Sequence, residues 1–65
     1  MFKEFRSHKH QETIVYNEDN IQYDHGKWEW YVTGEGMQTG NDYRVILDEA
    51  PRENAFYVRD IIRQF

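Results

Sequence analysis

The fold is decided by the stretch IQYDHGKWEWYV at residues 21–32, which carries two alternating runs around a short turn signal. His25-Gly26 lies between the runs, and Gly readily takes the positive φ angles that a two-residue hairpin turn requires. With the turn at this point, every apolar pair falls on one face, and a slip of one residue would separate them. The predicted register places Tyr23 opposite Trp28, Ile21 opposite Trp30 and Asp24 opposite Lys27.

Further strands are predicted on both sides of this hairpin. The run 13–16 alternates, and the residues 17–20 that follow it have turn composition, which would set Tyr16 opposite Ile21. After a Gly-rich loop at 34–42, residues 43–48 alternate again, with Tyr43, Val45 and Leu47 on one side. We therefore expect an antiparallel meander of three to four strands, at about 12–17, 20–24, 27–33 and 43–48. Its core face would carry Ile14, Tyr16, Ile21, Tyr23, Trp28, Trp30 and Val32.

The C-terminal segment is predicted to form one helix over about 51–64, packed on one face of the sheet. Pro51 suits the first helical turn, where its missing N–H costs nothing. At about 100° per residue, one broad arc of the segment is apolar, comprising Ala55, Tyr57, Val58, Ile61, Ile62 and Phe65. The predicted fold class is thus α+β. Residues 1–11 are interpreted as a polar, basic N-terminal arm that allows a short strand or turn, and residues 12–65 as a single domain.

The composition of the 65-residue chain limits its chemistry. The absence of Cys excludes disulfides and thiolate metal sites and fits a cytoplasmic location. No apolar run approaches the ~20 residues that span a bilayer, so no membrane segment is expected. Residues 17–49 contain eight acids against Lys27 and Arg44, a net charge of −6, whereas the rest of the chain carries +2. An acidic centre disfavours contact with phosphate and suits a basic protein surface.

The sequence contains no recognisable catalytic set. Ser7 is the one Ser, so a Ser-His-Asp arrangement has no support. His8, His10 and Glu12 would share one face of a strand, a spacing compatible with a metal, but a polar arm without a fourth ligand explains them better. We therefore expect a protein that is not an enzyme and that has no metal site and no cofactor.

Two surfaces of opposite charge are candidates for partner binding. On the predicted helix, the spacing i, i+4, i+7, i+11 aligns Arg52, Phe56, Arg59 and Arg63. An aromatic side chain framed by Arg is typical of a protein–protein hot spot, although a solvated helix face with Phe56 against the sheet edge also explains the pattern. On the sheet, Tyr31 and Val15 form a small apolar patch opposite the core face. The acids assigned to this second surface are Asp24, Glu29 and Glu35.

These surfaces lead to three hypotheses about function. The first is a small acidic protein-binding module that covers a functional surface of a host enzyme or nucleic-acid-binding protein, with DNA mimicry as one device. The second is a nucleic-acid-binding protein that uses the helix Arg residues and the basic arm. The third is a homodimeric structural subunit.

Two short stretches resemble the small inhibitors of uracil-DNA glycosylase that some bacteriophages encode. They are Gly26-Lys27 followed by aromatic residues, and Asp42-Tyr43-Arg44-Val45. The resemblance implies an inhibitor or adaptor of the kind carried by a phage or mobile element. Its motifs are unspecific, so no functional residue carries over.

Overall fold

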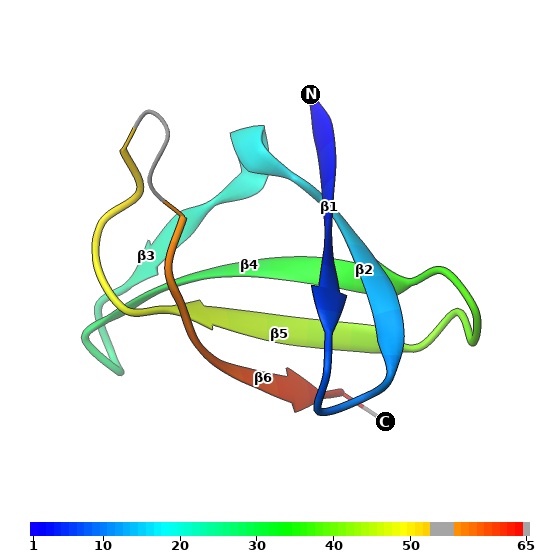
Figure 1. Ribbon diagram of the computed structural model, residues 1–65. Helices are drawn as coiled ribbons and strands as arrows, with labels where there is room; N and C mark the ends of the chain where they lie inside the picture. Colours follow the sequence, from blue (N-terminus) through cyan, green and yellow to red (C-terminus); the bar gives the residue numbers. More distant parts are fainter. Residues whose placement is uncertain (53–55, 65) are drawn as a thin grey trace.

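The computed structural model describes residues 1–52 and 56–64 as one antiparallel sheet that is curled into a half-barrel (Figure 1). The strands follow the order β1-β2-β4-β5-β6, and the short β3 pairs with β4. The elements are β1 (Phe2–Ser7), β2 (Glu12–Asn17), the 3₁₀ turn η1 (Glu18–Asn20), β3 (Gln22–Asp24), β4 (Glu29–Gly36), β5 (Asp42–Leu47) and β6 (Val58–Arg63).

The long strand β4 organises the sheet, because β3 pairs with its first half and β2 with its second half. Five residues separate Tyr16 from Gln22, whereas only two separate their partners Gly34 and Tyr31. The excess of three equals the length of η1. The segment from β2 to β3 therefore runs along one edge of β4 and is interrupted by η1. The predicted direct pairing of residues 13–16 with 21–24 is wrong, because both stretches pair with β4 instead.

The inner face of β4 bears no side chain at two positions, which lets β2 lie close against it. A Cβ atom on Gly34 would stand 2.5 Å from Cγ2 of Ile14. In Figure 1, β1 and β2 run at a steep angle to β4 and β5. The core lies inside this curl and consists of Ile14, Tyr16, Val32, Tyr43, Val45, Leu47 and Ile61.

The predicted C-terminal helix is wrong, because this segment forms the edge strand β6, antiparallel to β5. Val58, Ile61 and Ile62 are β-branched and favour extended backbone. Pairing with β5 also satisfies the backbone groups that β5 would otherwise leave open beside the core. The fold class is therefore all-β and not α+β. Glu53, Asn54, Ala55 and Phe65, which the helix prediction also included, lie outside the described residues.

The central hairpin is present, but its turn is longer than predicted. Residues 25–28 form the loop, so Tyr23 lies opposite Trp30 instead of Trp28. Asp24 stabilises this loop, because its Oδ1 accepts the backbone N–H groups of Gly26 (2.9 Å) and Lys27 (3.2 Å). The register moves by two residues, which keeps Tyr23 on the inner face but leaves Trp28 outside the core, 79% exposed and at φ 57°.

The N-terminal residues are part of the sheet, since β1 pairs with β2 along its whole length. Phe56 packs against the core and stacks on Tyr16, with ring centroids 4.7 Å apart, while the Phe5 ring is 5.9 Å from it. Lys9 donates to the backbone oxygen of Ile61 (3.2 Å) from the turn after β1. These contacts hold β1 and β2 near β6. Among the described residues, no helix has the length and apolar character needed to cross a membrane.

The close approach of β2 to β4 predicts that Gly34→Ala is destabilising. The new methyl group would meet Ile14 and would stand 3.1 Å from the backbone oxygen of Val15, so the strands must separate. We expect a loss of about 1–3 kcal/mol in the free energy of unfolding, measured by urea denaturation. Gly26→Ala is the matched control, because its Cβ meets only Asp24 Oδ1 at 3.3 Å in an exposed loop. Equal losses in the two variants would contradict the packing described.

Candidate functional site on the outer face of the sheet

A buried carboxylate occupies the inner side of the half-barrel. Glu12 accepts hydrogen bonds from the Tyr43 hydroxyl, from Thr39 Oγ1 (2.9 Å) and from Thr39 N (3.2 Å). The hydrogen bond from Tyr43 is the largest influence and lowers the pKa of Glu12 below its ordinary value of 4.5, although burial acts in the opposite direction. The carboxylate thereby joins β2, the β4–β5 turn and β5, which makes it a structural group.

The three residues considered for a metal do not converge. Glu12 points inward and is fully engaged, whereas His8 is exposed in the turn after β1. His10 contacts Ser7, with Nδ1 3.1 Å from Oγ, and its ring lies 4.6 Å from that of Tyr43. Within residues 1–52 and 56–64, no group of three or more His, Cys, Asp or Glu side chains is arranged to hold a metal ion.

On the outer face, Arg44 contacts three of the residues predicted to bind a partner. Its Nη2 donates to Asp24 (2.7 Å) and to Glu29 (3.4 Å), and its guanidinium lies 3.8 Å from the centre of the Tyr31 ring. Burial alone would raise the pKa of Asp24, but the hydrogen bonds from Arg44 and from the backbone of Lys27 and Gly26 together lower it. The charges of Asp24 and Glu29 are therefore neutralised within the fold. Arg44, which neutralises them, was not among the predicted site residues.

The predicted Arg stripe is dispersed, because the helix that would align it does not form. Arg59 pairs with Glu29 (3.0 Å) on the sheet, and Arg52 pairs with Glu49 (2.6 Å) in the segment after β5. Phe56 is half-buried against the core instead of standing between Arg side chains. Arg63 lies at the end of β6. The structure thus brings Arg59 to the Arg44 cluster and leaves the other members apart.

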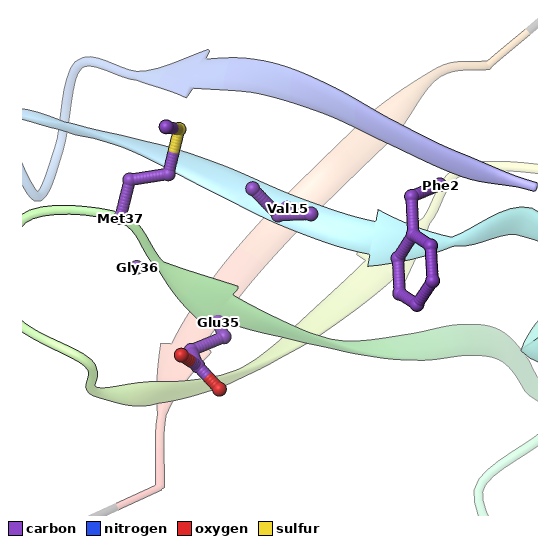
Figure 2. A pocket seen from close by; sticks show the side chains of 5 residues that line it. All are labelled: Phe2, Val15, Glu35, Gly36 and Met37. Carbon is purple, nitrogen blue, oxygen red and sulfur yellow. The ribbon is translucent and has the colours of Figure 1, made fainter.

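A groove of about 310 Å³ opens elsewhere on the outer face, over β2. It is lined by Phe2, Val15, Glu35, Gly36 and Met37. Figure 2 shows Val15 between Phe2 and Met37, with the Glu35 carboxylate to one side. Phe2 is 73% and Met37 is 59% exposed, so two large apolar side chains stand in water at the ends of one hollow. Of the residues predicted for the second surface, Glu35 and Val15 line this groove.

Carboxylates without a basic partner gather beside the groove. The sheet register aligns Glu4 with Val15, Val15 with Glu35, and Glu35 with Asp42, in one row across β1, β2, β4 and β5. Within the part of the chain that the structure describes, none of these three acids forms an ion pair. The groove and the row share Val15 and Glu35, so together they form one apolar and acidic surface.

Trp28, which was predicted to lie in the core, is a second exposed feature. It lies in the β3–β4 loop, next to Lys27 and at the opposite end of β4 from the groove. The signal that could have placed it outside is the sequence Asp24-His25-Gly26, since an Asp side chain often caps a turn wider than two residues. Among the residues that line the described groove, Trp28 does not appear.

Comparison with known proteins gave no match: no family model fits the chain, and neither a curated protein nor a solved structure is significantly similar to it. The site is therefore interpreted from its own geometry.

The hydrogen bonds to Glu12 predict a loss of stability in acid. Because the folded-state pKa lies below the ordinary value of 4.5, Glu12 stabilises the fold above that pH, and this stabilisation is lost as the pH falls through the folded-state pKa. We expect the urea midpoint to fall between about pH 6 and about pH 3. Tyr43→Phe should lower the midpoint at the higher pH and reduce the dependence on pH.

Tyr23→Phe is the matched control, since Tyr23 contacts Trp30 and His25 and not Glu12. It should keep the pH dependence of the wild-type protein. A Tyr43→Phe variant whose midpoint falls as steeply with pH as that of the wild type would show that Glu12 does not depend on this hydroxyl.

Proposed function

We propose that this protein is a binding module that recognises a protein partner through the outer-face groove and covers a surface of that partner. The observation that carries the proposal is the apolar hollow between Phe2 and Met37, flanked by carboxylates that have no ion-pair partner among the described residues. An apolar centre with a polar rim is the usual anatomy of a protein–protein interface. Inhibition or adaptation of a host enzyme, in the cytoplasm, is the role that we propose for such a contact.

Exposure of the groove residues supports binding. Phe, Met and Arg are enriched in interfaces, and an exposed Phe or Met gains free energy when a partner removes it from water. Burial of Phe2 and Met37 side chains by a partner would contribute roughly 1.5–3 kcal/mol each before the cost of association. The outer face presents exposed apolar side chains that can bind a partner, whereas the polar side chains on the inner face stabilise the fold. We therefore favour binding over catalysis.

The alternative of nucleic-acid binding receives less support. Among the described residues, five of the eight basic side chains form ion pairs, namely Lys3, Lys9, Arg44, Arg52 and Arg59. The row across the sheet contains three acids, Glu4, Glu35 and Asp42, that have no ion-pair partner among the described residues. These carboxylates repel phosphate. Broad DNA mimicry is also less favoured, because Asp24 and Glu29 are neutralised by Arg side chains.

Photocrosslinking tests the proposed surface. A photoreactive amino acid at Met37 should form an adduct with one defined protein in an extract of the host cell, because this side chain lies in the proposed interface. Tyr57 is the matched control position, with 56% exposure against 59% for Met37, and it lies outside the groove, directly before β6. Excess unlabelled wild-type protein should suppress the Met37 adduct, and excess Phe2→Ser protein should suppress it less.

Adducts that form equally from both positions, or that the Phe2→Ser protein suppresses as well as the wild type does, would contradict the proposal. Adducts with nucleic acid alone would support the alternative function.

A further inference from the structure

We infer that the groove binds a segment of the partner in which a Lys or Arg side chain is flanked by apolar residues. This inference rests on the proposed function and specifies the chemistry of the partner. It follows from the placement of acids on both sides of one apolar floor.

The floor of the site is Val15, a half-buried residue on the central strand of the three that form the groove. Phe2 and Met37 lie at its two ends along the strand direction (Figure 2). An extended apolar surface of this kind suits the aliphatic part of a long side chain, which packs on apolar groups while its charged end stays near water. Phe2 and Met37 would contact the apolar residues that flank this Lys or Arg in the partner.

Acidic residues flank the floor on both sides, Glu35 as part of the groove lining and Glu4 as the register neighbour of Val15 in β1. Glu4 in β1 and Glu35 in β4 are the direct neighbours of Val15 across the sheet. Since two strand spacings separate them, their Cα atoms stand about 10 Å apart. Flexible Glu side chains can therefore converge on one cation above Val15, and Asp42 lies next to Glu35 in the same row. A cation over this floor would also lie near the Phe2 ring, which favours positive charge.

The carboxylates of Glu4, Glu35 and Asp42 are available to a partner, because no basic side chain of the described residues neutralises them. Asp24, Glu29 and Asp60 already have Arg or Lys partners, whereas no basic side chain of the described residues pairs with Glu4, Glu35 or Asp42. Nucleic acids and anionic lipids would meet repulsion at this surface. A basic protein segment suits the site, because the alkyl part of its Lys or Arg side chain can pack on Val15 and its positive charge can pair with the flanking acids.

Titration with a synthetic peptide tests the inference. The probe is a short peptide that alternates Lys with Leu, and its matched control carries acetyl-lysine, which keeps the stem but removes the charge. Binding is followed by the NMR shifts of the methyl groups of Val15 and Met37. We expect the Lys peptide to shift these signals with an affinity that falls as salt is added, and the acetylated peptide to bind more weakly.

Charge-neutral variants separate the groove from overall acidity. The double change Glu4→Gln and Glu35→Gln should weaken peptide binding roughly tenfold, because two exposed ion pairs are lost. Asp48→Asn and Glu49→Gln together remove the same amount of charge just beyond β5 and should change the affinity by less than about twofold. Circular dichroism and the urea midpoint of each variant confirm that the fold is retained.

The inference is contradicted by equal binding of the acetylated peptide, by equal weakening in the two double variants, or by NMR shifts confined to the Trp28 loop. If the Lys peptide fails to bind while Met37 still crosslinks to a protein partner, the basic chemistry is wrong and the proposed function stands. If both experiments fail, the proposed function is wrong as well. Binding of single-stranded DNA in place of the peptide would also overturn the inference.

Discussion

The rest of the structure depends on the close contact between β2 and the inner face of β4 at Gly34 and Gly36, where β4 has no side chain. The Glu12 carboxylate fills the space where a side chain at Gly36 would otherwise lie, since a Cβ atom there would stand 2.3 Å from Glu12 Oε1. Because Tyr43 and Thr39 also donate to this carboxylate, one group fixes β2 against β4, β5 and their connecting turn. The same pairing of β2 with β4 aligns Val15 with Glu35 on the other side of the sheet. The contact that closes the core therefore also builds the groove.

The strands could be predicted where alternation and turn chemistry agree. The run around His25-Gly26 specified a hairpin and its inner face, and Tyr43, Val45 and Leu47 are buried together as expected. The partner of β2 could not be predicted, because η1 lets the chain skip a direct turn and return along β4. The C-terminal segment was ambiguous in period: its apolar residues fit a helical arc as well as a strand with a bulge. The open edge of β5 decides between them, and that edge is a property of the tertiary structure.

The candidate site was predictable only in part, since it depends on which charges are paired. Glu35 and Val15 were expected on the face opposite to the core, and both line the groove. Tyr31, Asp24 and Glu29 were expected there too, but Arg44 engages all three. Phe2 and Phe5 are three residues apart, so residues 2–7 show no apolar alternation that could have placed Phe2 on the outer face. Met37 follows β4 in a Gly-rich stretch, where no periodicity announces its position.

A double-mutant cycle on Glu12 and Gly36 tests the central contact most directly. Gly36→Ala should be strongly destabilising in the wild-type protein, because the new methyl group collides with the buried carboxylate. In a Glu12→Ala background the collision partner is absent, so the same change should fill vacant space and cost little or raise the urea midpoint. Strong coupling between the two changes is the result that this account predicts. Losses that simply add would contradict it, because they would show that Glu12 does not occupy the space beside Gly36.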